Sequence, residues 1–259
     1  MSDDGIERDG FRRDDLVVVT GAGGGFGRAF AHRFARDGAR LALWEINQES
    51  GEETTRQVRD KGAEARFFEV DLVDSKAIEK AVADTLAAFG TPYCVINNAS
   101  IYPRASVVDM EVAVFEKTLK INIVAPFHIC KLFGPKMLAA KRGVVINIAS
   151  GRALEGAPKG ANYSSSKGAI LAFTKSLALE WAPHNVRVNA IIPGVSLTAQ
   201  PLENTNETEL LSRGKGIPMR RIGYPEDMAG LAAYLAGPDA AYMTGQGVAM
   251  NGGKVLVPQ

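Results

Sequence analysis

The residues with the clearest chemical potential are a hydroxyl, a phenol and an amine within one short stretch. Ser150 follows an apolar run, Tyr163 comes thirteen positions later, and Lys167 follows the tyrosine by four. If the segment from Tyr163 is helical, the phenol and the amine lie on one face and within reach of each other. Because a nearby cation stabilises a phenolate, this spacing predicts a tyrosine that exchanges a proton near neutral pH.

A glycine-rich turn near the N-terminus predicts the binding site for a cofactor. The apolar residues 16–19 are typical of a buried parallel strand, and they run directly into Thr20-Gly21-Ala22-Gly23-Gly24-Gly25-Phe26-Gly27. Residues 28–37 then have helical spacing. A glycine-rich turn is often only a tight turn, but strand, turn and helix together let a backbone approach a pyrophosphate. We therefore expect a dinucleotide here.

An acidic residue predicts which dinucleotide binds. A second apolar run at 41–44 ends on Glu45, roughly 20 positions beyond the glycines, where a carboxylate accepts hydrogen bonds from an adenosine ribose. A 2′-phosphate would be repelled there, and the neighbouring Ile46 offers no arginine. The prediction is NAD rather than NADP. The alternative is an ordinary surface carboxylate that opens the next helix.

The rest of the chain alternates between apolar runs and amphipathic segments, which predicts one α/β domain over residues 16–259. We expect a Rossmann-type doubly wound sheet of about seven mostly parallel strands, with helices on both faces. Residues 1–15 are expected to form a mobile arm, and the polar segment near 197–217 a substrate lid. The further strands are predicted at 66–70, 93–96, 144–148, 186–192 and 248–250, and the helices at 48–61, 75–89 (with Ser75 as N-cap), 112–138, 163–181 and 225–235.

The composition of the chain argues against several classes of binding partner. The 259 residues carry a net charge of +1 with no basic stripe, which argues against nucleic acid. No leader or membrane-spanning run stands out, and Cys94 and Cys130 lack metal or redox spacing, as do the three histidines. We therefore expect no metal and no membrane partner, and a cytoplasmic protein with core cysteines.

Further motifs follow one another along the chain. In order, the set is Thr20-Gly21-x-x-x-Gly25-x-Gly27, Asn97-Asn98-Ala99, Asn122 within a helix, Ser150, Tyr163-x-x-x-Lys167, Pro193-Gly194, Arg221-x-Gly223-x-Pro225-Glu226-Asp227 and Thr244-Gly245-Gln246. Together these motifs resemble the compact branch of the short-chain dehydrogenase/reductase family from about residue 16 to 254. Three positions depart from the family pattern, namely Ser100 for a usual Gly, Ser196 for Val or Ile, and Asn251 for Asp.

The resemblance implies roles for four residues. Tyr163 would be the general acid/base, and Lys167 would also hydrogen-bond the nicotinamide ribose. Ser150 would orient the substrate hydroxyl, and Asn122 would hold a water that connects Lys167 to solvent. The reaction would be hydride transfer between a substrate carbon and the nicotinamide.

The same resemblance implies the rest of the cofactor site and a homotetramer or homodimer, with a tetramer packed through the helices that carry Asn122 and Tyr163. The implied cofactor residues are Gly21, Gly24, Gly25, Phe26, Gly27, Glu45, Ile46, Asp71, Leu72, Asn98, Ala99, Ser100, Tyr163, Lys167, Pro193, Gly194, Ser196 and Thr198.

The substrate pocket should be lined by the loops after Ser100 and Ser150 and by the lid. Besides Ser150 and Tyr163, we expect Arg104, Arg152 and Lys159 to contact substrate. Guanidinium groups suit carboxylate, phosphate or sulfonate, which predicts a small polar alcohol or carbonyl compound such as a sugar, sugar acid or sulfonated sugar. Solvated loop charges are an equally good explanation of these residues.

Three other functions compete with this prediction. The nearest is an NADPH-dependent carbonyl or 3-oxoacyl-type reductase of the same family. A sugar-nucleotide epimerase of the extended branch would carry a larger C-terminal substrate domain. A non-catalytic nucleotide sensor would be expected to lack Tyr163 or Lys167, and both are present.

Overall fold

A seven-stranded parallel sheet lies at the centre of the molecule. The structure is a computed structural model that describes residues 10–198 and 206–255. The strands follow the order β3-β2-β1-β4-β5-β6-β7, and each neighbouring pair is parallel. Their bounds are β1 Leu16–Thr20, β2 Arg40–Glu45, β3 Ala65–Glu69, β4 Cys94–Asn97, β5 Gly143–Ile148, β6 Val186–Pro193 and β7 Gly247–Met250.

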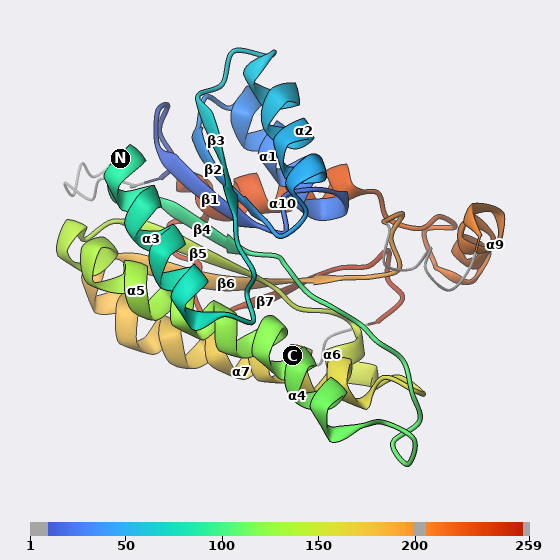
Figure 1. The fold of residues 1–259 in the computed structure, drawn as a ribbon. Coiled ribbons are helices and arrows are strands. Elements are labelled where there is room, and N and C mark those ends of the chain that lie inside the picture. Colours follow the sequence, from blue (N-terminus) through green and yellow to red (C-terminus); the bar gives the residue numbers. More distant parts are fainter. Residues whose placement is uncertain (1–9, 199–205, 256–259) are drawn as a thin grey trace.

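Helices cover both faces of the sheet, as predicted (Figure 1). One face carries α1 Gly25–Arg36, α2 Gln48–Arg59 and α10 Pro225–Ala236. The other carries α3 Ser75–Phe89, α5 Ala125–Ala140 and α7 Ala161–Trp181, with α4 Val112–Leu119 leading into α5. The shorter elements are α6 Arg152–Glu155, α9 Glu207–Ser212, the π-turn η1 Lys120–Val124, and the 3₁₀ turns η2 Ala182–His184, η3 Arg213–Gly216 and η4 Pro238–Ala240.

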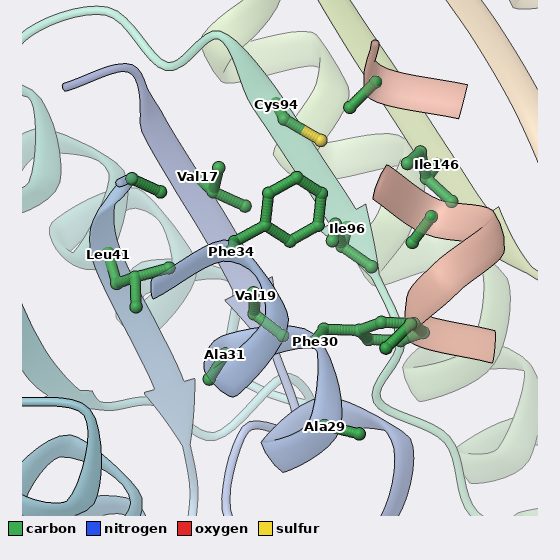
Figure 2. Close-up of a cluster of buried hydrophobic side chains, with 14 of the residues drawn as sticks. Val17, Val19, Ala29, Phe30, Ala31, Phe34, Leu41, Cys94, Ile96 and Ile146 are labelled. Carbon is green, nitrogen blue, oxygen red and sulfur yellow. The ribbon is translucent and has the colours of Figure 1, made fainter. Parts of the chain in front are cut away.

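Alternate side chains of the central strands enter two separate cores. Val17 and Val19 of β1 pack with Phe30 and Phe34 of α1 on one face, as Figure 2 shows. The intervening Val18 packs toward α3, α5 and α7 on the other. Because both faces are covered, the strands read as continuous apolar runs rather than as alternating ones. Cys94 and Cys130 are buried free thiols in these cores.

Two local features differ from the prediction. Asp74, not Ser75, caps α3, because its Oδ1 accepts a hydrogen bond from the backbone N–H of Lys76 at 2.8 Å. The segment predicted as one helix over 112–138 changes to π-helical geometry between α4 and α5, around the buried Asn122. Single turns of π-helix within α-helices are frequent at functional sites.

The segment expected to be a mobile arm is partly packed. Phe11 contacts the rings of Phe34 and Tyr93 at centroid distances of 5.6 and 6.2 Å. The Asp15 carboxylate lies 2.7 Å from Arg142 Nη1. Residues 10–15 are therefore attached to the domain, and residues 1–9 lie outside the described part of the chain.

The continuous helical stretch from Val112 to Ala140 also differs from expectation. By length and composition alone it is long and apolar enough to cross a membrane, although no such run was predicted. Its buried residues Ile129, Phe133 and Met137 belong to the core formed with α3 and α7. This packing accounts for its apolar composition within the fold.

Candidate active site

The carboxyl ends of the strands open into one long cleft of about 1090 Å³. The chain reverses its direction along the sheet between β1 and β4, and in open parallel sheets ligands bind beside such a switch point. The volume slightly exceeds the roughly 300–1,000 Å³ of ordinary small-molecule sites. It leaves room for a dinucleotide and a second small molecule.

The glycine turn forms the floor of one end of the cleft. Gly21 has φ +65°, and a Cβ there would come within 2.9 Å of Ala99 Cα. A Cβ on Gly27 would overlap the carbonyl oxygen of Gly21, so this glycine allows α1 to pack closely and does not itself line the cleft. Gly24 is the N-cap of α1 without a side-chain cap, and a Cβ there would meet nothing within 4 Å. The helix terminus and the space above Gly24 fit a pyrophosphate.

Glu45 lies where a ribose would follow such a pyrophosphate. Its Oε2 accepts a hydrogen bond from Gly23 N at 3.0 Å, and its Oε1 accepts from the backbone N–H groups of Ile46 and Asn47 at 2.9 and 3.1 Å. These bonds hold a carboxylate against the cleft. Asp71 and Leu72 line the cleft after β3, beside Ile46. These residues form the end of the cleft at which an adenosine was predicted.

The other predicted cofactor residues lie along the same cleft. Asn98 is held in place by the β1 end, because its Nδ2 donates to the Thr20 carbonyl at 2.8 Å. The Ser196 side chain does not project freely, since its hydroxyl donates to the Gly194 carbonyl at 3.2 Å. The lining residues in this group are Gly21, Gly24, Gly25, Phe26, Asn98, Ala99, Ser100, Pro193, Gly194, Ser196 and Thr198.

Helix α7 presents Tyr163 and Lys167 to the same cleft, one helical turn apart. The Lys167 Nζ lies 5.6 Å from the centroid of the Tyr163 ring and donates a hydrogen bond to the Ile148 carbonyl at 2.7 Å. The side chain of Ser150, just beyond β5, hydrogen-bonds the Tyr163 hydroxyl. The hydroxyl, phenol and amine predicted from sequence thus meet at one place.

Burial dominates the titration of both helix residues. Removal from water raises the pKa of Tyr163 to about 12, although the hydrogen bond with Ser150 acts in the opposite direction. Burial lowers the pKa of Lys167 to about 7. We predicted a lowered tyrosine pKa, and in the protein by itself this is wrong. The amine donates to a carbonyl rather than to the phenol oxygen, so it does not offset the loss of solvent.

Asn122 lies behind the cleft wall rather than on its surface. Its Oδ1 accepts from Ile101 N at 2.9 Å, while its Nδ2 donates to the Ile101 carbonyl and to Ser166 Oγ, both at 3.0 Å. The side chain therefore ties the loop after β4 to α7. A water relay through Asn122 stays a prediction.

The predicted substrate residues divide into two groups. Arg104 and Arg152 line the cleft, whereas Lys159 is exposed and is not among the lining residues. Lys159 instead accepts a hydrogen bond from Ala105 N on its backbone carbonyl at 3.2 Å. The Arg152 guanidinium is partly neutralised, because its Nη1 lies 3.2 Å from the Glu155 carboxylate.

Three cationic residues that line the cleft have no motif that could have revealed them. Lys117 of α4, Arg213 of η3 and Lys254 after β7 all line the cleft. The ring of Tyr102 stacks on Tyr163 with a centroid distance of 4.2 Å and an interplanar angle of 22°. Within residues 10–198 and 206–255, no group of three His, Cys, Asp or Glu side chains could hold a metal ion.

Comparison with known proteins decides the family. A family model described as enoyl-(acyl carrier protein) reductase matches residues 21–254, which include the glycine turn, Tyr163 and Lys167. The chain belongs to the short-chain dehydrogenase/reductase family. The resemblance inferred from the motifs is thereby confirmed, and so is the fold class.

Relatives within this family have different named activities. D-threitol dehydrogenase of Mycolicibacterium smegmatis is 34% identical, with 95% of each chain covered. The 3-oxoacyl-(acyl-carrier-protein) reductase FabG of Chlamydia muridarum is 33% identical, covering 92% of this chain and 96% of the relative.

Among solved structures, NAD⁺-bound xylitol dehydrogenase has a TM-score of 0.87 at 33% identity, covering 93% of this chain and 99% of the other. A putative NAD(P)-dependent gluconate 5-dehydrogenase from Beutenbergia cavernae, with bound NADP, has a TM-score of 0.88 at 34% identity, covering 93% and 97%. The family thus makes this chain an oxidoreductase with small-alcohol dehydrogenases among its relatives.

Proposed function

We propose that this short-chain dehydrogenase uses NAD to oxidise a secondary alcohol or hemiacetal carbon of a small polar, anionic sugar-like substrate, or to reduce the corresponding carbonyl. The observation that carries the proposal is the single cleft, which has Glu45 at one end and Ser150, Tyr163 and Lys167 at the other. A nucleotide sensor would not require the second group. Relatives named as threitol and xylitol dehydrogenases support a small polyhydroxylated substrate.

The residues of the cleft would hold the dinucleotide from end to end. The α1 terminus would bind the pyrophosphate, Glu45 the adenosine ribose, and Lys167 the nicotinamide ribose. When bound, NAD⁺ supplies a hydride acceptor and a positive ring charge. Such a charge favours the phenolate form of a nearby tyrosine and opposes the effect of burial on the Tyr163 pKa.

The protein's own groups would then handle the proton. Ser150 orients the substrate hydroxyl through its side-chain oxygen, and the Tyr163 phenolate takes the hydroxyl proton as the carbonyl forms. In reduction, the neutral phenol returns that proton to the substrate oxygen. A buried Lys167 with a pKa near 7 can exchange a proton close to neutral pH.

Two arginines support an anionic substrate. Arg104 lies on the loop after β4, Arg152 begins α6, and both line the cleft that contains the catalytic group. Replacing each by Met should lower kcat/KM for a sugar acid about tenfold, the equivalent of about 1.4 kcal/mol, with little effect on the neutral polyol of the same length. If both variants kept the wild-type ratio of kcat/KM for the sugar acid to that for the neutral polyol, anion binding would be contradicted and neutral polyols would remain as the substrates.

An NADPH-dependent 3-oxoacyl-type reductase is the second candidate, because FabG is a relative and one structural neighbour holds NADP. The Glu45 carboxylate favours the first candidate, since it would repel a 2′-phosphate. Calorimetric titration with NADH and NADPH separates the two. Binding of NADPH as tightly as NADH would favour the reductase.

We also propose a cytoplasmic homotetramer or homodimer. The helices that carry Asn122 and Tyr163 expose Val124, Phe127 and Leu179, with exposed fractions of 50%, 51% and 80%. Apolar side chains on adjoining helices are typical of subunit contacts. Analytical ultracentrifugation tests the assembly, and a monomer at micromolar concentration would contradict it.

The activity itself is tested by following NADH formation across a panel of polyols, sugars, sugar acids, sulfonated sugars and simple secondary alcohols. Wild type is compared with Tyr163→Phe, which keeps the ring but removes the titrating hydroxyl. We expect turnover with at least one polyhydroxylated substrate and a loss of about 100- to 10,000-fold in the variant. Equal turnover by the variant would contradict the proposed role of Tyr163.

A further inference from the structure

The ring of Tyr102 covers one face of the Tyr163 ring. Their centroids lie 4.2 Å apart and the ring planes differ by 22°, so the two phenols form a parallel stack. The Lys167 ammonium is also over the Tyr163 ring, 5.6 Å from its centroid. The Arg104 guanidinium lies 5.8 Å from the Tyr102 centroid. Tyr102 thus links an arginine of the substrate end to the acid–base group.

A glycine provides the space that Tyr102 occupies. Gly160 precedes the first turn of α7, and a Cβ there would lie 2.5 Å from the Tyr102 hydroxyl oxygen and 2.8 Å from its Cε2. The backbone of Gly160 has φ −139°, which any residue can adopt. The need for glycine at this position is therefore one of space. Any larger residue would displace the Tyr102 ring.

The loop that carries Tyr102 is held on both sides of the residue. Asn122 binds both the N–H and the carbonyl of Ile101. The fully buried Asn162 donates from Nδ2 to the Pro103 carbonyl at 3.1 Å and to Thr118 Oγ1 at 3.0 Å. These bonds come from α7 and from the helical stretch that contains α4 and η1, so they fix Tyr102 relative to the helix that carries Tyr163.

We propose that Tyr102 is a positioning residue for Tyr163: its ring holds the orientation of the catalytic phenol and keeps water from one of its faces. The inference rests on the proposed function, because it takes Tyr163 as the acid–base group. Within the described residues, four groups act on the Tyr163 ring or hydroxyl. Tyr102 comes from the loop after β4, Ser150 and Arg152 from the segment after β5, and Lys167 from α7 itself.

The first test needs no substrate. Phenolate absorbance of the unliganded protein is titrated in wild type, Tyr102→Leu and Tyr102→Phe, each with and without Tyr163→Phe, so that the difference isolates Tyr163. In wild type, Tyr163 should stay protonated through about pH 11, consistent with its pKa of about 12. Tyr102→Phe keeps the burial of the ring and loses only the smaller charge effect of the Tyr102 hydroxyl, so the Tyr163 pKa should stay above its ordinary value. In Tyr102→Leu water reaches the ring, and the Tyr163 pKa should fall toward the ordinary value of about 10.

The second test uses the best substrate from the panel. Tyr102→Leu should lower the plateau of kcat about ten- to a hundredfold and move its pH profile to lower pH, because a misplaced phenol costs rate while its pKa falls. Tyr102→Phe keeps the stack and should stay within about twofold of wild type. Circular dichroism and Tm confirm that each variant is folded.

A double-mutant cycle separates positioning from general destabilisation. Gly160→Ala should lower kcat as Tyr102→Leu does, yet add no further loss in the Tyr102→Leu background. Gly168→Ala is the matched control, since it lies on the same helix and a Cβ there meets nothing within 4 Å.

An unchanged Tyr163 titration and kcat plateau in Tyr102→Leu would overturn the inference, as would additive losses in the cycle. Full turnover by Tyr163→Phe would refute the proposed function instead, while the titration would still report whether Tyr102 shields the ring.

Discussion

At the nucleotide end of the cleft, the glycine turn contributes its backbone, and side chains such as Glu45 and Asp71 follow the neighbouring strands. The substrate end is lined by large side chains from several separate segments, including Tyr102, Arg104, Arg152 and Tyr163. A backbone turn serves any dinucleotide in the same way, whereas side chains can differ with each substrate. This difference explains why the glycine turn indicates the family, whereas the side chains of the second end distinguish substrates among its members.

The glycine turn provides the largest expected effect. Gly27→Ala places a methyl group onto the Gly21 carbonyl oxygen and should cost about 3 kcal/mol of unfolding free energy, measured in urea. Gly24→Ala is the control, because its methyl enters open space in the cleft. It should leave stability near wild type but weaken NADH binding. Unaltered NADH affinity would mean that the pyrophosphate does not lie over Gly24.

At the substrate end, by contrast, removing the buried amine of Lys167 should stabilise the folded protein near neutral pH. The folded-state pKa of Lys167 is near 7 against an ordinary 10.5, so wild-type stability falls as the pH drops from about 10.5 to 7. Each pH unit in that window is worth about 1.4 kcal/mol. The free energy of unfolding that Lys167→Met gains over wild type should therefore be larger at pH 7 than at pH 10, by at least about 2 kcal/mol. An equal difference at both pH values would show that the buried amine keeps its ordinary pKa.

Cofactor choice should depend on one side chain of the nucleotide end. Glu45→Ser removes the carboxylate that would repel a 2′-phosphate, so the ratio of NADPH to NADH affinity should rise about tenfold, or about 1.4 kcal/mol. Glu49→Ser is the control, since Glu49 is exposed on α2 and is not among the lining residues of the cleft. A similar change in the NADPH-to-NADH affinity ratio in both variants would indicate a general charge effect and would contradict a contact between Glu45 and the adenosine ribose.

The smallest expected effect concerns the Arg152–Glu155 pair. Both side chains are partly exposed to solvent, at 41% and 34%, and ion pairs near the surface contribute little to stability. Glu155→Gln should leave Tm unchanged and lower KM for an anionic substrate by about two- to threefold, because it releases the arginine. An effect of the same size on a neutral polyol would contradict a contact between Arg152 and an anion.

Much of this site was predictable because its signals are local. The first strand, the glycine turn, the helix and the second strand, which ends at Glu45, form one continuous pattern. Tyr163 and Lys167 are one helical turn apart. Such spacings need no knowledge of tertiary structure. The parallel sheet followed for the same reason, because short apolar runs alternate with amphipathic segments.

The remaining features depend on contacts between distant segments. Tyr102 meets Tyr163 where the loop after β4 lies against α7, and Asn122 and Asn162 hold that loop in place. The direction of the tyrosine pKa shift depends on burial, which spacing does not reveal. In the same way Lys159 and Arg152 are equivalent as loop cations, but the fold brings only Arg152 into the cleft.

The most direct test of the account measures nicotinamide reduction with the best alcohol of the panel, using equal concentrations of NAD⁺ and NADP⁺, in wild type and Tyr163→Phe. The account predicts faster reduction of NAD⁺ by wild type. It also predicts that Tyr163→Phe binds NADH normally while losing about 100- to 10,000-fold in kcat. Preference for NADP⁺, or undiminished turnover by Tyr163→Phe, would contradict it.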